Sequence, residues 1–534
     1  MANKLSWWKN AVVYQIYPLS FRDTNQDGVG DLEGIIEKLK YLNDGTEKSL
    51  GIDAIWLSPI YPSPWADFGY DVSDYCAVHP ALGNLATFDA LVEEAGKRGI
   101  KIIMDLVVNH TSQEHPWFQE SRSSTDNPKR TWYIWQDENE EEGPPNNWPS
   151  FFGGSAWTRD ARTNQYYLHK FLPEQPDLNL WNPEVQEAIL ASVRFWLERG
   201  VAGFRIDVAD LLLEDNSFAD APVINAPVGH DVAEPIRWEK VYWRPETHEF
   251  LKKLRKLLDE YGAIGIGEVS PAHMLDFYGA EDDELQLPFN FSLIGMPWSA
   301  APIRSAINSY ESSLGNGQWP NYVLGNHDNK RLSSRIGPEN ARAAALMLLT
   351  LRGTIFLYYG DEIGMEDVPM NRDQLKDTPS LRFSHKESRD PARTPMQWSN
   401  EFAAGFSGAE PWLPIHENCQ TLNVEAQDKD RLSLLALYRR LIHLRKKSVA
   451  LSSGAYESLY VIPKTILAYR RYTTSEEYLI IINFTDKTVR PDLSEYHFSG
   501  CCVLSTHSLY NTKQPKLLQK IILRPREGKV FRIY

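Results

Sequence analysis

Short apolar runs alternate with longer segments of helical spacing along most of the chain. The runs are rich in β-branched residues and bounded by turn residues, which is typical of β-strands. They lie at 11–16, 54–57, 100–108, 203–206, 263–267, 322–324 and 355–358. Apolar positions with helical spacing lie at 31–42, 84–98, 183–198, 245–261 and 338–351. With 284–297 included, the pattern gives eight strand–helix units, which predicts a parallel sheet, either open and doubly wound or closed into a (β/α)8 barrel.

This alternation is interrupted once and then ends. Residues 111–175 are polar and rich in Pro, Gly, Asn and Trp, and this stretch is too long for a structureless loop, so we expect an inserted subdomain. Beyond 453, short strands follow one another without helices, at 458–462, 466–472, 478–484 and 529–534. We therefore predict a barrel from 1–110 and 176–453, an inserted subdomain at 111–175, and a C-terminal antiparallel β-sandwich domain at 454–534.

The composition excludes several classes of protein. The chain has 534 residues, 42% hydrophobic and 24% charged, which argues against disorder, collagen and coiled coils. Its net charge of −15, without any block of basic residues, argues against binding of nucleic acid. The 17 Trp, 25 Tyr and 21 Phe suit stacking on sugar rings, but such residues also fill large cores.

Targeting and redox features are few. The start of the chain shows no basic segment followed by an apolar one, and no apolar stretch approaches the ~20 residues of a membrane span. Cys76, Cys419, Cys501 and Cys502 lack the spacing of metal ligands. We therefore expect a cytoplasmic protein with reduced thiols, without membrane or nucleic-acid partners, that is a monomer or a weak homo-oligomer.

Three acidic residues stand at the carboxyl ends of predicted strands. Asp207 follows the strand at 203–206, Glu268 follows the strand at 263–267, and Asp328 follows the run that ends at Leu324. Strand ends on one face of a barrel converge, and active sites lie there. Three neighbouring carboxylates repel one another, which raises at least one pKa and is useful when one acid must stay protonated while another attacks.

Basic residues next to these acids strengthen the interpretation. Arg205 is two positions before Asp207, hence on the same face of the strand, and can keep Asp207 ionised. His110 and His327 can donate hydrogen bonds to sugar hydroxyls. A single Asp after a strand is more often a helix cap or a surface acid, but three together with Arg and His favour an active site.

The segments that carry these residues resemble a known family. Residues 105–110 (DLVVNH), 203–208 (GFRIDV), 267–269 (GEV) and 326–328 (NHD) are similar, in order and spacing, to the four sequence regions of the α-amylase family of glycoside hydrolases. Further segments resemble its α-glucosidase and oligo-1,6-glucosidase branch: 13–18 (VYQIYP), 67–71 (DFGYD) and 392–398 (ARTPMQW). The resemblance runs nearly end to end and implies the closed (β/α)8 barrel, often called a TIM barrel.

The resemblance also implies a retaining mechanism. Asp207 is expected to be the nucleophile that forms a β-glucosyl-enzyme, and Glu268 the general acid and then the base. Asp328 is expected to hold hydroxyls of the distorted sugar ring. In retaining glycosidases the carboxyl groups of nucleophile and acid/base lie about 5–5.5 Å apart, so we expect this separation between Asp207 and Glu268.

A glucose-binding subsite follows from the same resemblance. Its expected residues are Asp67, Tyr70, His110, Phe152, Phe171, Gln175, Arg205, His327 and Arg393. Tyr70 would be the stacking platform, while Phe152 and Phe171 would come from the inserted subdomain. Plain core packing is the alternative role for these three aromatic side chains.

A second cluster of oxygen-bearing residues follows the first predicted strand. The sequence 23–31 (DTNQDGVGD) alternates such side chains around a glycine, much as an EF-hand loop begins but without its final Glu. In the branch that this chain resembles, the loop holds calcium or magnesium. The matching ligands are Asp23, Asn25, Asp27, the Val29 carbonyl and Asp31, in a structural role; the alternative is a polar turn without metal.

The resemblance implies an exo-acting α-glucosidase that hydrolyses terminal α-linked glucose from short oligosaccharides or small α-glucosides, with some transglycosylation. Val208 is similar to the residue of branch members that favour α-1,6 links, although a valine at a buried strand end is ordinary. The segment 216–238 would border the acceptor site and could favour sucrose or an aglycone that is not a sugar.

Three alternatives remain. A glucosyltransferase or isomerase of the trehalose synthase or sucrose isomerase type would use the same three carboxylates. A hydrolase of a phosphorylated disaccharide would need basic residues on the acceptor side, and no convincing set is present. A non-catalytic transporter subunit would lack the trio and carry a membrane span.

Overall fold

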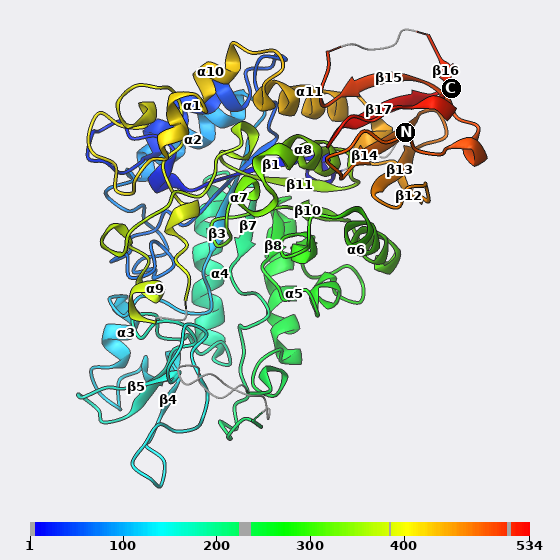
Figure 1. Ribbon diagram of the computed structural model, residues 1–534. Helices are drawn as coiled ribbons and strands as arrows, with labels where there is room; N and C mark the ends of the chain where they lie inside the picture. Colours follow the sequence, from blue (N-terminus) through cyan, green and yellow to red (C-terminus); the bar gives the residue numbers. More distant parts are fainter. Residues whose placement is uncertain (1–5, 224–235, 384–385, 510–513) are drawn as a thin grey trace.

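The computed structural model describes residues 6–223, 236–383, 386–509 and 514–534. Eight parallel strands form its central sheet in the order β10-β11-β1-β2-β3-β7-β8-β9 (Figure 1). Their bounds are β1 Val12–Ile16, β2 Ala54–Leu57, β3 Lys101–Leu106, β7 Gly203–Ile206, β8 Ile264–Gly267, β9 Leu287–Pro288, β10 Asn321–Val323 and β11 Thr354–Tyr358. The surrounding helices are α1 Leu32–Leu42, α2 Leu85–Lys97, α4 Pro183–Glu198, α5 Pro245–Glu260, α6 Ala300–Ser313, α7 Leu332–Ile336, α8 Ala341–Thr350 and α11 Leu434–Lys446.

The sheet closes on itself at the seam between β9 and β10. There a side chain takes the place of backbone pairing: the Asn321 amide donates to the Pro288 carbonyl at 2.6 Å and accepts the Asn290 N–H at 3.0 Å. Because both ends of the sheet meet at this asparagine, the predicted (β/α)8 barrel is confirmed and the open doubly wound alternative is excluded.

Alternating residues of each strand divide the core into two layers. Val13, Trp56, Ile103 and Phe356 point inward and pack with one another inside the barrel. Their neighbours along the strands point outward and pack against the helices. This period-two alternation explains why the strands are apolar on both faces.

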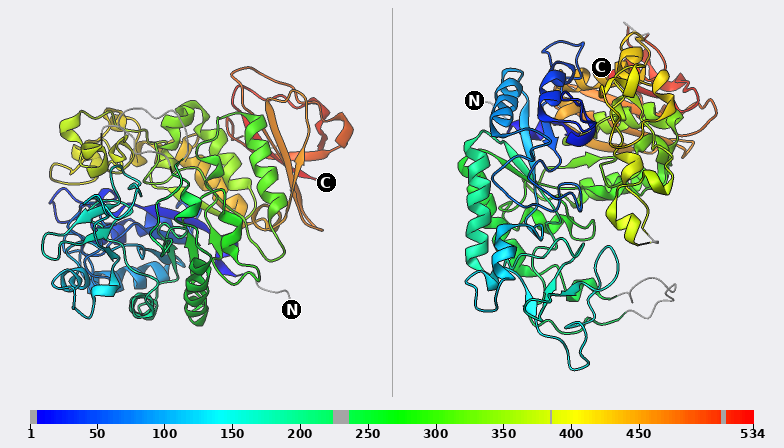
Figure 2. Two further views of the ribbon diagram at one scale, coloured as in Figure 1. Left: turned by 90° about the horizontal axis from the view of Figure 1, so that it is seen from below. Right: turned by 90° about the vertical axis from the view of Figure 1, so that its left-hand side faces the viewer.

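The predicted inserted region leaves the barrel after β3 and returns at α4. It contains α3 Pro116–Ser121 and a small antiparallel sheet in the order β4-β6-β5, with bounds β4 Trp135–Gln136, β5 Trp157–Arg159 and β6 Tyr166–Leu168. Figure 2 shows it as a lobe beside the barrel. The chain between β11 and α11 is a second long excursion, with the short helices α9 Thr378–Arg382 and α10 Val424–Asp428.

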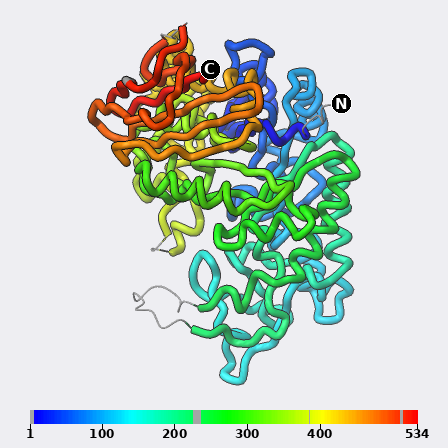
Figure 3. The backbone as a smooth tube through the Cα atoms, turned by 90° about the vertical axis from the view of Figure 1, so that its right-hand side faces the viewer, coloured from blue at the N-terminus to red at the C-terminus, as the bar shows by residue number. Residues whose placement is uncertain are grey.

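The C-terminal region follows the short helix α12 Val449–Ser452 and folds into one antiparallel sheet in the order β12-β13-β14-β17-β15-β16. Its strands are β12 Ala455–Leu459, β13 Ile466–Tyr472, β14 Glu477–Asn483, β15 Ser499–Ser505, β16 Lys516–Leu517 and β17 Gly528–Ile533. One face packs on α6 and α8 of the barrel (Figure 3), and a separate apolar cluster covers the other face. A sandwich has two sheets, whereas the strands described here share a single one, because the barrel helices serve as the second layer.

The sequence pattern missed several of these elements. Helices α6 and α11 and strands β15 and β16 have no counterpart among the predicted segments. The predicted region 216–238, expected to border the acceptor site, includes 224–235, which lie outside the described residues. Across the described residues, no helix combines the length and the apolar composition needed to cross a bilayer.

Candidate active site

A cavity of about 230 Å³ opens at the carboxyl ends of the barrel strands. Ligand sites commonly measure about 300–1,000 Å³, so this one suits a single sugar ring better than a chain. It is lined by Asp67, Tyr70, His110, Phe152, Phe171, Asp207, Val208, Glu268, His327, Asp328 and Arg389. The structure thus brings together the three predicted catalytic carboxylates and six of the nine predicted subsite residues. The other three, Gln175, Arg205 and Arg393, lie behind the wall of the cavity.

Arg205 joins three of the acids at the strand ends. Its guanidinium donates to Asp207 at 2.7 Å, to Glu268 at 2.5 Å and to Asp105 at 2.8 Å. The side chain is only 1% exposed, and it lies 5.4 Å from the centre of the Trp56 ring inside the barrel. Asp207 and Glu268 therefore both contact the same guanidinium, while their expected separation of about 5–5.5 Å stays a prediction.

Burial dominates the protonation of this group. It raises the pKa of Asp207 well above the usual range; the Arg205 guanidinium opposes that rise, and the charge of Glu268 adds to it. Burial likewise raises the pKa of Asp105 to about 6, against the effect of Arg205 and of the Tyr70 hydroxyl that donates to it at 2.9 Å. Arg205 is thus the contact that favours an ionised Asp207, as a nucleophile needs.

Asp328 lies in the opposite electrostatic environment. Its Oδ1 accepts from Arg393 at 2.9 Å and from Arg389 at 3.5 Å, and its Oδ2 lies 3.2 Å from Nε2 of His327. Burial alone raises a carboxyl pKa, but His327, Arg393 and Arg389 outweigh burial and hold the pKa of Asp328 well below its usual range. Asp328 is therefore a permanent anion that can accept hydrogen bonds from sugar hydroxyls.

The hydrogen bonds of His327 fix its proton. The Gln15 amide donates to Nδ1 at 2.8 Å, so the neutral ring carries its hydrogen on Nε2, which faces Asp328 and the cavity. Burial lowers the pKa of His327 to about 3, which keeps the ring neutral near pH 7. The ring also stacks on Tyr70, with centroids 5.3 Å apart and planes 1° from parallel.

A second set of contacts joins the wall residues Asp67, His110, Phe152, Phe171 and Arg389. Asp67 accepts from Arg389 at 2.6 Å and from Gln175 at 3.2 Å. Phe171 packs on the imidazole of His110 at 5.3 Å and on Phe152 at 5.4 Å. These contacts hold the side chains on this part of the wall in place, and the small volume of the cavity suits a single sugar ring.

Arg389 was not among the residues predicted from the sequence. Besides Asp67 and Asp328, it contacts Asp377 at 2.6 Å and lies 5.5 Å from the centre of the Phe152 ring. One signal was available, because Arg389 stands four residues before the predicted Arg393 in the same segment. Its partners are 12 to 322 residues away, and no local pattern relates positions so far apart.

The predicted metal loop forms a tight turn in which carboxylate oxygens accept backbone N–H groups. Asp23 accepts from Gln26 at 2.7 Å and from Gly28 at 2.9 Å. Asp31 caps α1 by accepting the Gly34 N–H at 2.7 Å. Within the described ranges no three His, Cys, Asp or Glu side chains form a group that could hold a metal ion, so a cation here would also need Asn25 and the Val29 carbonyl.

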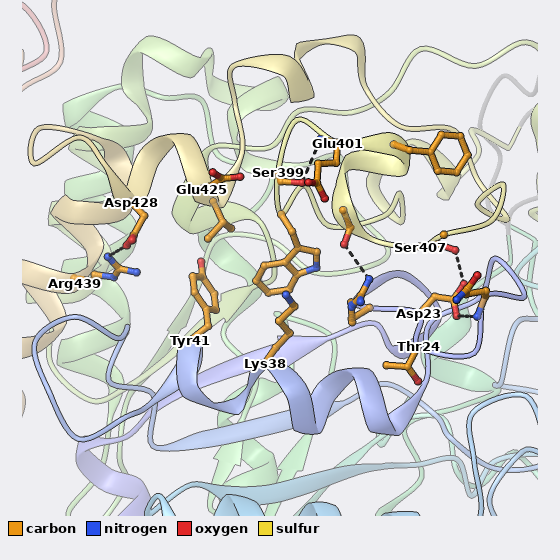
Figure 4. A pocket seen from close by; sticks show the side chains of 17 residues that line it. Asp23, Thr24, Lys38, Tyr41, Ser399, Glu401, Ser407, Glu425, Asp428 and Arg439 are labelled. Carbon is orange, nitrogen blue, oxygen red and sulfur yellow. Dashed lines mark hydrogen bonds and ion pairs between the residues drawn. The ribbon is translucent and has the colours of Figure 1, made fainter.

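A groove of about 940 Å³ begins beside this loop and runs between α1 and residues 398–408 and 424–428 (Figure 4). The ammonium of Lys38 covers the Trp398 ring at 4.3 Å, and the Tyr41 hydroxyl donates to Glu362 at 2.6 Å. The groove shares no lining residue with the cavity that contains Asp207, Glu268 and Asp328, so the two are separate.

Known proteins support the same architecture. Residues 15–454 match the family model for the alpha amylase catalytic domain. The oligo-1,6-glucosidase of Parageobacillus thermoglucosidasius is 38% identical, covering 99% of each chain. Among solved structures, the alpha-glucosyl transfer enzyme XgtA matches with a TM-score of 0.89 and 37% identity, covering 99% of this chain and 100% of that one. The isomaltulose synthase SmuA from Protaminobacter rubrum matches with a TM-score of 0.90 and 34% identity, covering all of both chains. The chain belongs to the alpha-amylase catalytic domain family.

Proposed function

We propose that this protein is a retaining exo-acting α-glucosidase that releases terminal α-linked glucose from short oligosaccharides or small α-glucosides. The observation that carries the proposal is the small cavity, about 230 Å³, with Asp207, Glu268 and Asp328 on its wall. The kinship with an oligo-1,6-glucosidase supports the hydrolytic reaction.

The first step forms a covalent intermediate. Asp207 attacks the anomeric carbon while Glu268 gives its proton to the departing glycosidic oxygen, so one bond to that carbon forms as another breaks. Positive charge develops on the sugar ring in the transition state. Asp328, a permanent anion, binds ring hydroxyls, and the neutral His327 offers its Nε2 hydrogen to the same ring.

In the second step Glu268 takes a proton from water, which attacks the anomeric carbon and releases Asp207. Two inversions leave the product with the α configuration. A sugar or another alcohol in place of water gives transglycosylation by the same route.

Transfer or isomerisation of the glucosyl group is the second candidate. XgtA and SmuA share the fold over nearly the whole chain, and they are named as an alpha-glucosyl transfer enzyme and an isomaltulose synthase. The same trio serves either outcome, and the balance depends on how well the acceptor side excludes water. Trehalose synthase or sucrose isomerase chemistry therefore stays the alternative to hydrolysis.

Proton NMR of the enzyme with isomaltose and maltose in one tube tests the proposal, with Asp207→Asn as the blank. We expect α-glucose to appear before it mutarotates, with isomaltose consumed first if Val208 favours α-1,6 links. New glycosidic signals without free glucose would support transfer or isomerisation. Equal rates for the wild type and the variant would refute the assignment of Asp207.

We also propose that the loop at 23–31 binds calcium or magnesium in a structural role. The alternating oxygen-bearing side chains around a glycine support this. After treatment with a chelator, added calcium should raise the melting temperature of the wild type but not that of Asp27→Ala. The same rise in both proteins, or none in the wild type, would argue for a polar turn without metal.

A cytoplasmic location and a monomeric or weakly associating chain are proposals as well. The composition and the cysteine spacing support them. Cell fractionation and light scattering of the purified protein are the measurements that test them.

A further inference from the structure

The loops that follow β7 and β8 are joined by three hydrogen bonds beside the nucleophile. The Val208 N–H donates to Oε2 of Glu268 at 3.2 Å, and the Ala209 N–H donates to the Glu268 carbonyl at 2.8 Å. The Ser270 N–H donates to Oδ2 of Asp210 at 2.7 Å. Residues 208–210 therefore contact the side chain of Glu268, its backbone and the residue two positions beyond it.

The first of these bonds depends on an unusual backbone. Val208 has φ 39°, in the left-handed region that a β-branched residue rarely adopts. This conformation lets its N–H reach the Glu268 carboxylate while its side chain lines the cavity. Strain of this kind persists only where surrounding contacts enforce it, and it is common at functional sites.

Asp210 supplies such a contact. Its side chain is 5% exposed, and the same Oδ2 that holds Ser270 also accepts the indole N–H of Trp243 at 3.2 Å. Trp243 packs on His273 with ring centroids 4.6 Å apart, just before α5 begins. One buried oxygen thus connects the loop after the nucleophile, the loop after Glu268 and the entry to α5.

We propose that Asp210 is a positioning residue for Glu268. It anchors the turn at 208–210 against the segment at 268–270, so that the strained Val208 N–H and Arg205 hold the Glu268 carboxyl toward the glycosidic oxygen. The inference rests on the proposed function, since it gives Glu268 the role of general acid. Asp210 does not touch the sugar cavity and acts only through its neighbours.

A displaced general acid penalises the substrates that need a proton on the leaving group. Methoxide is a poor leaving group, so cleavage of a methyl α-glucoside depends on a proton from Glu268. The 2,4-dinitrophenolate released from a 2,4-dinitrophenyl α-glucoside is a stable anion and departs without a proton. For Asp210→Ala, we expect kcat/KM for the methyl glucoside to fall about 10- to 100-fold. For the dinitrophenyl glucoside we expect kcat/KM to change by less than about threefold, because attack by Asp207 does not need the proton of Glu268.

Two further variants serve as matched controls. Asp210→Asn keeps an oxygen that can accept the same two bonds, so it should restore most of the activity on the methyl glucoside. Asp53→Asn alters a carboxylate that also accepts a backbone N–H, from Val12 at 2.9 Å, but does so just before β2 at the opposite end of the barrel. It should leave the ratio between the two substrates at the wild-type value.

The Val208 variants keep the inference testable if Asp210→Ala does not fold. Val208→Gly removes the backbone strain at this position and lets the N–H move away from the Glu268 carboxylate. Val208→Ala also removes most of the side chain, but alanine keeps the backbone restricted. We expect the substrate ratio to change at least about threefold more in Val208→Gly than in Val208→Ala.

Parallel losses on both substrates in Asp210→Ala, or equal ratios in the two Val208 variants, would overturn the inference. A wild type that cleaves neither glucoside would instead refute the proposed function, so the two failures are distinguishable.

Discussion

Two sets of buried arginines show how one side chain serves chemistry in one region and stability in another. Behind the wall of the cavity, Arg205 and Arg393 are at most 1% exposed and pair with carboxylates that line it. Between the barrel and the C-terminal sheet, Arg445 and Arg471 are fully buried and donate to backbone carbonyls instead.

The second pair completes the ends of helices. Arg445 donates to the carbonyls of Leu351 at 2.6 Å and Leu451 at 2.9 Å, and Arg471 to that of Thr350 at 2.6 Å. These carbonyls lie at the ends of α8 and α12, where orphan acceptors and the helix dipole favour a cation. The difference teaches that burial alone does not identify a functional arginine, whereas a carboxylate partner facing a cavity does.

Asp207→Asn should have the largest effect on the cavity. Loss of the nucleophile should lower kcat/KM by about 10⁴-fold or more. The melting temperature should stay the same or rise, because one of the mutually repelling carboxylates is neutralised. Steady-state kinetics and calorimetry on the same sample measure both quantities. A variant within tenfold of wild-type activity would contradict the assignment.

Arg445→Met should lower stability and leave activity unchanged, the converse of Asp207→Asn. It leaves several buried carbonyls without a donor, and we expect a loss of about 3 kcal/mol of stability. The folded fraction should keep kcat/KM within about twofold of the wild type, because the cavity is untouched. Urea unfolding measured alongside activity tests the pair of outcomes. Unchanged stability would show that water replaces the guanidinium, and a specific loss of kcat would contradict the division of roles.

Asp105→Asn tests whether the buried carboxylates around Arg205 make stability depend on pH. Burial raises the pKa of Asp105 to about 6 in the fold, against about 4 in the unfolded chain. The folded protein thus holds this proton more tightly, and that stabilisation is lost as pH rises from about 4 through 6. The stability of the variant should therefore depend less on pH across this range than that of the wild type. The difference should be at most about 2–3 kcal/mol and is measured from the melting temperatures of both proteins. Parallel curves for the two proteins would show that Asp105 stays ionised throughout.

Arg389→Gln should give the smallest of these effects. The change removes the cation that joins Asp67 and Asp328, so we expect KM for an α-glucoside to rise about tenfold, with a smaller loss of kcat. Arg382→Gln is the matched control, because Arg382 pairs with Glu174 at 2.6 Å while 41% exposed. Equal values of KM and kcat for the two variants would show that Arg389 does not contribute to substrate binding.

The comparison also explains how far the sequence could predict the molecule. The strands before Asp207 and Glu268 were located because short, mainly apolar runs end there, and Arg205 was placed beside Asp207 by the two-residue period of a strand. The period does not extend across loops. The role of Arg389 and the Asn321 seam were missed, because both depend on partners brought together only by closure of the barrel.

Similar limits apply to the elements that were not predicted. Strand β16 has only two residues, too few for any periodicity to register, and both are exposed. The buried residues Leu437, Tyr438, Leu441 and Ile442 of α11 do have helical spacing, so this helix was missed although the pattern is present in the sequence. The strain at Val208 has no sequence signature, since nothing in the residue type announces a positive φ.

Trapping of the covalent intermediate tests the central claim most directly. The enzyme would be incubated with 5-fluoro-α-glucosyl fluoride, digested and analysed by mass spectrometry. The account predicts one fluoroglucosyl group on the peptide that contains Asp207, and no label in Asp207→Asn. A label on Glu268 or Asp328, or turnover without any labelled peptide, would contradict it.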